Sequence, residues 1–321
     1  MNKFSHCGIM PNYECSAACR HCLYACSPER SGGYMTEKMM YEVCRTLKEG
    51  GCRSVHIGGG EPFLDFDGLL TLIQTAVRMG IAVDYVETNA SWFTSEGDVI
   101  KKLTLLEKAG TDTLCISVDP YHAEYIPYSL PLKLAEACRK AGFGYFLWRE
   151  QFLPMLKPLV ADKAHDRQDF EKIIGSDYII KTARAYGLRF GGRAVNIEAE
   201  FFPPKQKILN SDSCRGLLSF NHFHVDMYNR FIPPGCTGFV IPLGEVAGGI
   251  VPGRYPAFDV LLKEGIAGLL KLAGRHGFKP DEKGYTSGCA LCFHIRRFLS
   301  KKDGFPELDA EFYEQSLRFY T

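Results

Sequence analysis

The chain has 321 residues, and its 38 basic and 37 acidic side chains leave a net charge of +1. This balance excludes a nucleic-acid binder that relies on a basic face, and 46% hydrophobic with 23% charged residues excludes a disordered or fibrous chain. Uncharged apolar runs of about 18 residues do not occur, which predicts no membrane span, and the first residues lack the apolar core of a secretory signal.

Short β-rich runs alternate with helical stretches from Cys52 to Asn196, and a first strand precedes them. Six parallel strands joined by helices predict an α/β fold, a partial (β/α)6 TIM-like barrel, followed by a small loop-rich C-terminal cysteine domain. The expected strands are Cys7–Tyr13, Ser54–Ile57, Ala82–Glu87, Thr113–Val118, Gly144–Trp148 and Leu188–Phe190. The expected helices are Thr36–Glu49, Asp67–Arg78, Ser95–Ala109, Leu130–Ala141 and Gln168–Tyr186.

The composition changes after about residue 200. Phe201–Pro204 is a break, and glycine and proline are dense from there to Pro256. Helical patterning returns at Phe258–Gly274 and at Asp309–Tyr320. We therefore expect two domains, residues 1–200 and residues 201–321.

The chain contains 13 cysteines. An odd count, tight clusters and the lack of a signal peptide argue against a secreted disulfide scaffold. We therefore expect a cytoplasmic protein with reduced thiols, several of which bind metal.

The first cluster, Cys15, Cys19 and Cys22, has the spacing CxxxCxxC and directly follows the first strand. Three thiolates on one loop suit three irons of a [4Fe–4S] cluster and leave the fourth iron open. A structural zinc site is the alternative, with His21 or Cys26 as its fourth ligand. The first gap of three residues differs from the ferredoxin pattern.

A glycine-rich element, Gly58–Pro62, comes immediately after the expected strand Ser54–Ile57. Glycines at the carboxyl end of a strand let a ligand approach the backbone amide and carbonyl groups. An ordinary turn between a strand and a helix is the alternative reading. The position of the glycine-rich element, one strand after the cysteine loop, favours a binding role.

Together the CxxxCxxC loop and the GGEP element resemble the radical S-adenosylmethionine (SAM) superfamily. The resemblance covers about residues 5–200. It implies that Cys15, Cys19 and Cys22 hold a [4Fe–4S] cluster whose open iron binds SAM. An aromatic residue often precedes the third cysteine in that family, and His21 stands there in this chain. The GGEP element, which holds the SAM amino group in the family, is Gly59, Gly60, Glu61 and Pro62.

The resemblance also implies reductive cleavage of SAM to a 5′-deoxyadenosyl radical that takes hydrogen from a substrate. A low-potential reductant such as flavodoxin or ferredoxin would supply the electron. Polar residues at the strand ends would contact SAM, although the same residue types favour turns and helix caps. These residues are Thr88, Asn89, Ser117, Asp119 and Arg193. On the substrate side the candidates are Tyr121, His122 and Glu150.

A second group of thiols follows residue 200. Apolar and polar residues alternate around a turn at Tyr228–Arg230, which predicts a β-hairpin with a cysteine near each flank. The pattern resembles the twitch domain, a short form of the SPASM extension, and implies an auxiliary [4Fe–4S] cluster. Zinc or free core thiols are the alternatives. The four candidate ligands are Cys214, Cys236, Cys289 and Cys292.

Relatives with such a domain often modify peptides, so we expect oxidative modification or cross-linking of a peptide or protein side chain. The first cluster begins at Cys15, where we expect no preceding leader-peptide domain. That keeps a second reading open, a radical dehydrogenase or rearrangement enzyme acting on a small molecule. A non-catalytic iron–sulfur protein for electron transfer or sensing is the reading from another class. We expect no membrane or nucleic-acid partner.

Overall fold

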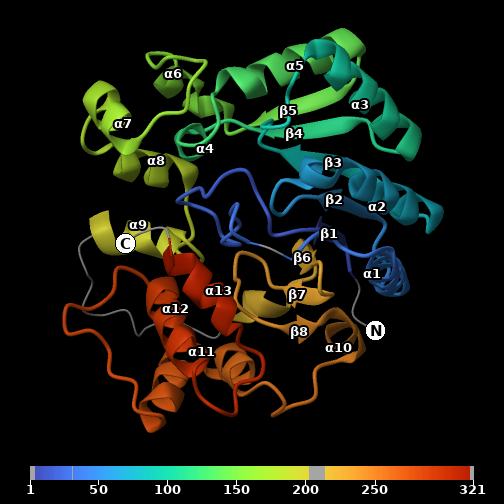
Figure 1. Ribbon diagram of the computed structural model, residues 1–321. Helices are drawn as coiled ribbons and strands as arrows, with labels where there is room; N and C mark the ends of the chain where they lie inside the picture. Colours follow the sequence, from blue (N-terminus) through green and yellow to red (C-terminus); the bar gives the residue numbers. More distant parts are fainter. Residues whose placement is uncertain (1–3, 31, 202–213, 319–321) are drawn as a thin grey trace.

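The computed structural model describes residues 4–30, 32–201 and 214–318. Its centre is a sheet of eight strands in the order β5-β4-β3-β2-β1-β6-β7-β8 (Figure 1). The strands are β1 (His6–Met10), β2 (Ser54–Ile57), β3 (Ala82–Thr88), β4 (Thr113–Ser117), β5 (Gly144–Trp148), β6 (Phe223–Asp226), β7 (Arg230–Ile232) and β8 (Ile241–Pro242).

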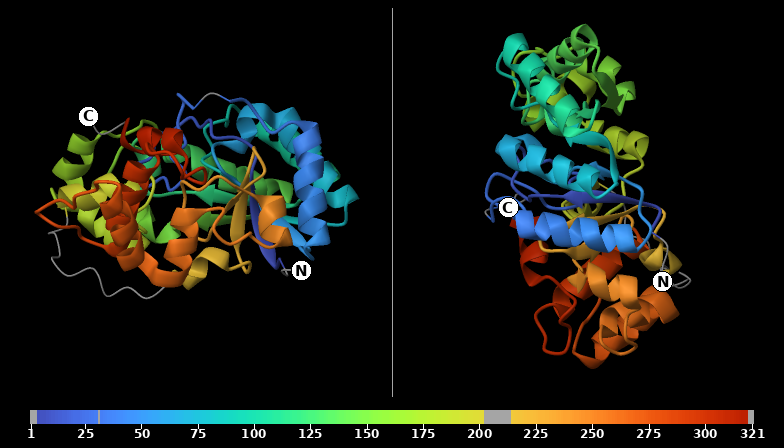
Figure 2. Two further views of the ribbon diagram at one scale, coloured as in Figure 1. Left: turned by 90° about the horizontal axis from the view of Figure 1, so that it is seen from below. Right: turned by 90° about the vertical axis from the view of Figure 1, so that its right-hand side faces the viewer.

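Strands β1 to β5 run parallel, as expected for strands joined by helices. The connecting helices α1, α2, α3 and α5 pack side by side in that order along the sheet (Figure 1, Figure 2). Between the sheet and these helices lies a core of residues such as Val55, Ile57 and Leu72, each fully buried. Local sequence sets the helix ends; for example, the Thr36 hydroxyl accepts from the Met39 amide at 3.3 Å. The helix bounds are α1 (Glu37–Glu49), α2 (Phe66–Arg78), α3 (Glu96–Ala109) and α5 (Ser129–Ala141).

The sheet is open rather than a closed barrel, and this part of the chain contributes five strands instead of six. Leu188–Phe190, expected as the sixth strand, is irregular in the structure. A run of three residues is too short for periodicity to identify a strand. The helix expected at Gln168–Tyr186 is also divided, into α7 (Arg167–Ile174) and α8 (Tyr178–Tyr186). The division falls at Gly175, whose φ of 116° is incompatible with a helix.

The C-terminal part extends the same sheet. The expected hairpin is confirmed: β6 and β7 pair antiparallel around Asn229, which adopts a left-handed φ of 60°. Strand β6 also pairs in parallel with β1, so segments more than 200 residues apart in sequence lie side by side. The expected domain boundary falls at the end of α9 (Ala194–Phe201), and residues 202–213 after it lie outside the described residues.

Helices from the last third of the chain gather beyond β8, at the opposite end of the molecule from α3 and α5 (Figure 1). Of the helices in the described residues, none is long and apolar enough to cross a membrane. The late helices are α10 (Leu243–Gly248), α11 (Pro256–Arg275, interrupted at Gly265), α12 (Gly288–Leu299) and α13 (Ala310–Leu317). The short helices are η1 (Pro62–Asp65), α4 (Pro120–Ala123), η2 (Glu150–Phe152), α6 (Leu153–Leu156) and η3 (Arg215–Leu218).

Candidate active site

A cavity of about 430 Å³ opens among the loops that follow β1 to β5. Its position matches the carboxyl ends of parallel strands, where sites are built in α/β folds. Most of the cluster and SAM-binding residues expected from the sequence lie in its wall. The cavity is lined by Cys15, Cys19, Cys22, Gly59, Gly60, Thr88, Asn89, Ser117 and His122, among others.

The cysteine loop is held by its own backbone. The Cys15 amide donates to the Ser27 carbonyl at 3.2 Å, and the Cys22 amide donates to the Cys19 carbonyl at 3.0 Å. Burial raises the pKa of the Cys15 thiol. A hydrogen bond from Cys26, aided by the charge of Arg193, lowers the pKa of Cys22 to about 5. Cys22 is therefore the thiol of this loop that ionises most easily, and thiolates are the form that binds metal.

The glycine-rich loop lies directly against the segment that leads into the cysteine loop. The Gly60 amide donates to the Asn12 carbonyl at 3.1 Å, and the Glu61 amide donates to the Glu14 carbonyl at 2.9 Å. A Cβ atom on Gly60 would lie 1.9 Å from the Glu14 carbonyl oxygen, so only glycine fits there. Gly59 has a φ of 112°, which also favours glycine. These glycines bring the two loops together.

Glu61 faces the protein interior rather than the cavity. Its fully buried carboxylate accepts hydrogen bonds from the Thr88 hydroxyl at 2.9 Å and from the Asn89 backbone amide at 2.8 Å. Burial raises the pKa of Glu61 to about 7. Pro62, also buried, begins the short helix η1. Glu61 and Pro62 thus anchor one end of the glycine-rich loop in the protein interior, whereas Gly59 and Gly60 line the cavity.

Asn89 links the end of β3 to the first cysteine. Its side-chain nitrogen donates to the Ser16 hydroxyl at 3.0 Å and to the Cys15 sulfur at 3.5 Å. The Thr88 hydroxyl, which donates to Glu61, also accepts from the Trp92 indole at 2.8 Å. Asn89 therefore positions a cysteine, whereas Thr88 positions the loops around it.

Asp119 and His122 form a buried pair beside the cysteine loop. Asp119 caps α4 by accepting from the Tyr121 amide at 2.9 Å, and its second oxygen lies 2.8 Å from His122 Nδ1. Although burial opposes it, the Asp119 charge raises the pKa of His122. His122 lines the main cavity, and Asp119 lines a small neighbouring pocket. Ser117, at the end of β4, lines both.

An aromatic stack surrounds His21. Its ring lies 4.8 Å from the Tyr121 ring centroid and 4.9 Å from that of Tyr186. Burial lowers the pKa of His21 to about 4, so its ring is neutral at pH 7. Tyr121 itself is fully buried, and its hydroxyl donates to the Ile179 carbonyl at 3.4 Å. Tyr121 therefore belongs to the wall behind His21.

Two residues expected at the site have other positions. Arg193 is buried and donates from Nε to the Cys19 carbonyl at 3.0 Å and from Nη2 to the Cys26 carbonyl. It holds the cysteine loop from behind. Glu150 is exposed at the start of η2.

Arg149, which directly precedes Glu150, is a cation at the site that was not among the residues expected to bind SAM. It lines the cavity, and its guanidinium lies 4.3 Å from the Tyr186 ring centroid. Its left-handed φ of 68° is uncommon for a residue with a side chain and is typical of functional sites. The available signal was its place at the end of the fifth expected strand, but its backbone conformation could not be read from sequence.

The second cysteine group lies beyond the hairpin. Cys289 and Cys292 lie three residues apart in the first turns of α12, on one face of the helix. Burial, then the charges of Cys236 and Cys289, raise the pKa of the Cys214 thiol. Burial and the charges of Cys236 and Cys214 likewise raise the pKa of Cys292. The four thiols thus lie within electrostatic reach of one another.

Neither cysteine group has the spacing of a single zinc ion. Zinc, with bonds of about 2.3 Å to sulfur, would bring its thiolate ligands within about 4 Å of one another. Among the described residues, the groups of donor side chains whose ligand atoms all lie within 4.8 Å are His6–His56–His222 and His21–Asp119–His122. Neither contains a cysteine.

Comparison with known proteins finds a family match in the first part of the chain. Residues 9–148 match the family model of the radical SAM superfamily. A curated relative, YydG of Bacillus subtilis (strain 168), is named for a proposed part in peptide biosynthesis. It is 26% identical over 126 residues, which is 39% of this chain and only 39% of that protein.

Solved structures with a similar chain course include Streptococcus suis SuiB bound to S-adenosylmethionine. It is 16% identical with a TM-score of 0.43, and the match covers 96% of this chain and 74% of SuiB. BtrN in complex with AdoMet and 2-DOIA is also 16% identical with a TM-score of 0.45, covering 86% and 91% of the two chains.

Proposed function

We propose that this chain, an enzyme carrying a radical SAM superfamily domain at residues 9–148, modifies a peptide or protein side chain by an oxidative radical reaction. Bound at Cys15, Cys19 and Cys22, a [4Fe–4S] cluster would reduce SAM to methionine and a 5′-deoxyadenosyl radical that takes hydrogen from the substrate. The observation that carries the proposal is the joint position of these thiols and the glycine loop in one cavity.

The protein contributes orientation and exclusion of water from the reacting groups. The exposed backbone of Gly59 and Gly60 lines the cavity and offers polar groups to the SAM amino group. We assign the SAM carboxylate to Arg149 instead of Arg193. Arg149 lines the cavity, whereas the Arg193 side chain donates to two loop carbonyls. The neutral His21 ring, stacked on Tyr121, gives a flat surface for the adenine.

The substrate side of the cavity is aromatic and polar. Tyr85 and Glu87 on β3 and Trp148 at the end of β5 line it. The relation to a protein named for peptide biosynthesis supports a peptide as the source of the substrate side chain.

An auxiliary [4Fe–4S] cluster on Cys214, Cys236, Cys289 and Cys292 would accept the electron left on the substrate. A direct contact joins the two cysteine segments: the Thr237 hydroxyl, next to Cys236, donates to the Leu23 carbonyl, next to Cys22, at 3.0 Å. An acceptor held beside the first cluster makes the net reaction an oxidation. The electrostatic influence of these thiols on one another supports this ligand set.

The test is anaerobic reconstitution, followed by incubation with SAM, dithionite and a deuterated candidate peptide. We expect about eight irons per chain, 5′-deoxyadenosine as a product, and deuterium in that product. The Cys15→Ala variant should lose SAM cleavage, whereas Cys44→Ala, which changes a buried cysteine on α1, should retain it. Equal 5′-deoxyadenosine from both variants would contradict the proposal. Iron without SAM cleavage would identify an electron-transfer or sensor protein.

A further inference from the structure

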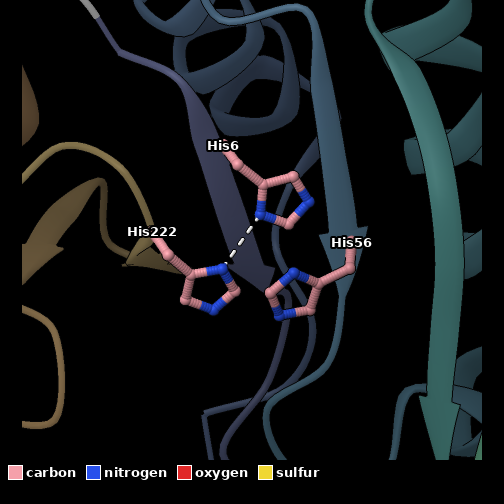
Figure 3. Close-up of side chains that lie close together, drawn as sticks. All are labelled: His6, His56 and His222. Carbon is pink, nitrogen blue, oxygen red and sulfur yellow. Dashed lines mark hydrogen bonds between the residues drawn. The ribbon is translucent and has the colours of Figure 1, made fainter.

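Three histidines, His6, His56 and His222, meet on the inner face of the sheet and are called here the histidine group (Figure 3). His6 begins β1, and His222 directly precedes β6, its parallel neighbour. His56 and His222 line the same cavity as the cysteine and glycine loops, so the group lies beside the proposed cluster and SAM site. None of the three histidines is assigned to the cluster or to SAM.

A glycine makes room for the group. Gly8 on β1 pairs with His56 on one side and His224 on the other. A Cβ atom on Gly8 would lie 2.2 Å from the His224 ring and 2.5 Å from His56 Nε2. The absence of a side chain at this position lets the imidazoles from β2 and β6 approach across β1.

The rings converge on a small space. His6 Nδ1 and His222 Nδ1 lie 3.1 Å apart, and the His56 ring faces this pair (Figure 3). The three rings are nearly parallel, with interplanar angles of 10° to 17°. One nitrogen from each residue lies within 4.8 Å of the other two. Such an arrangement offers three nitrogen ligands to one ion.

His56 supplies the independent observation that a ligand belongs there. Its side chain is 1% exposed, and its Nε2 lies 3.3 Å from His224 Nε2. Its Nδ1 is buried and has no hydrogen-bond partner. Buried polar nitrogens are nearly always satisfied, so an unpartnered one facing two further imidazoles marks a binding position.

Carboxylates lie behind the rings, as they do behind histidine ligands of metals. Asp84 Oδ2 lies 3.2 Å from His6 Nε2, and Glu87 Oε1 lies 3.6 Å from His56 Nε2. A bulge in the β2–β3 pairing, opposite Val55 and His56, places the extra residue, Asp84, at this position. A carboxylate on Nε2 fixes the tautomer that leaves Nδ1 free for metal.

We propose that the Nδ1 atoms of His6, His56 and His222 bind a divalent transition metal ion of the zinc class. Imidazole suits Zn²⁺, Ni²⁺ and Cu²⁺, and zinc bonds of about 2.0–2.1 Å place neighbouring nitrogens about 3.4 Å apart. The 3.1 Å pair already matches this spacing. His222 is exposed, which gives the ion an entry path and a fourth position for water.

The ion would join three strands. His222 enters β6, the first strand of the C-terminal part, whereas His6 and His56 lie on β1 and β2. Binding would therefore fasten the C-terminal part of the chain to the radical SAM domain, without any redox or bond-breaking step.

The experiment uses the full chain with its iron–sulfur sites reconstituted, because free thiols also bind zinc. One equivalent of Co²⁺ or Zn²⁺ is added, the chain is desalted, and retained metal is measured. We expect one ion per chain and visible Co²⁺ bands of a nitrogen and oxygen site, without thiolate charge-transfer absorption. Binding should survive in His276→Ala, a change at an exposed histidine outside the group.

Two variants keep the test decisive if loss of the buried His56 ring unfolds the chain. His222→Ala removes an exposed ligand and should abolish retention of the ion. Asp84→Asn removes only the carboxylate behind His6 and should weaken binding about 10- to 100-fold. Retention of Co²⁺ by His222→Ala equal to the wild type, thiolate bands in place of nitrogen bands, or no retained ion at all would each overturn the proposal.

Discussion

The Glu61 carboxylate accepts the hydroxyl hydrogen of Thr88 at 2.9 Å within the protein interior. This bond joins the loop after β2 to the end of β3. The same carboxylate accepts from the Asn89 amide, and Asn89 donates from its side chain to Cys15. A chain of two contacts through Asn89 thus connects the glycine-rich loop to the first cysteine.

Replacing Glu61 with Gln should disturb this chain of contacts. The new amide group would place an NH₂ opposite the Thr88 hydroxyl or the Asn89 amide, which both now donate. Leaving one buried group unsatisfied should cost about 1–3 kcal/mol of unfolding free energy. Urea unfolding measures this loss, and SAM affinity should fall with it. Unchanged stability would show that the buried carboxylate contributes nothing to the loop.

Gly60→Ala should displace the glycine loop from the cysteine loop. Its Cβ would lie 1.9 Å from a backbone oxygen that cannot rotate away, so overpacking should cost about 1–3 kcal/mol. Reconstituted iron and SAM binding should both decrease. Gly97→Ala is the matched control, because its Cβ meets no atom within 4 Å on helix α3. The control should be neutral or slightly stabilising.

Variants of Arg149 and Arg193 should have different effects, one on SAM binding and the other on the support of the cysteine loop. Arg149→Lys should weaken SAM binding about tenfold or more with iron content unchanged, because lysine lacks the planar fork that binds carboxylates. Arg193→Lys should reduce iron content, since its two carbonyl contacts need two guanidinium nitrogens. Iron analysis and SAM titration distinguish them. The opposite result would return the SAM carboxylate to Arg193.

The Asp119–His122 pair should give a pH-dependent stability. The pKa of Asp119 is depressed, so the stability that Asp119 contributes is lost as pH falls through that pKa. The raised His122 pKa means that the contribution of His122 is lost as pH rises through its own. Asp119→Asn should therefore cost most at neutral pH, about 3–5 kcal/mol, and less at alkaline pH. Urea unfolding of the wild type and of Asp119→Asn at neutral and alkaline pH measures the loss of unfolding free energy. An equal loss at the two pH values would contradict the ion pair.

Local sequence predicted those parts of the fold that local interactions determine. Ser54–Ile57 and Gly144–Trp148 were predicted to the residue, because glycines and helix caps mark where those strands begin and end. The strand predicted at Leu188–Phe190 was wrong, because three residues are too few to show the alternation of apolar and polar residues that identifies a strand. The contacts of Arg193, in the same region, could not be predicted, since their partners lie about 170 residues earlier in the chain.

The site was predictable where spacing alone determines chemistry. Cys15, Cys19 and Cys22 could be assigned to one cavity because they share a loop after a strand. The histidine group could not, because His6 and His222 meet only through the β1–β6 pairing, 216 residues apart. The strained backbone of Arg149 likewise depends on tertiary packing and leaves no local signal.

Replacing one of the auxiliary thiols should impair substrate oxidation but leave SAM cleavage intact. Cys214→Ala should lower iron below about eight per chain, because one iron of the auxiliary cluster loses its protein ligand. The first cluster, on a different loop, should still cleave SAM. Product formation should fall far more than 5′-deoxyadenosine formation, since the electron left on the substrate would have no acceptor.

Cys138→Ala provides the control for this last change, because Cys138 is a buried cysteine on α5 outside both groups. It should keep about eight irons and the full product yield. Product formation by Cys214→Ala at the wild-type ratio to 5′-deoxyadenosine would contradict an electron-accepting cluster there. Iron content alone cannot decide this, because a cluster that only stabilised the fold would also be lost, so the ratio of the two products is the decisive quantity.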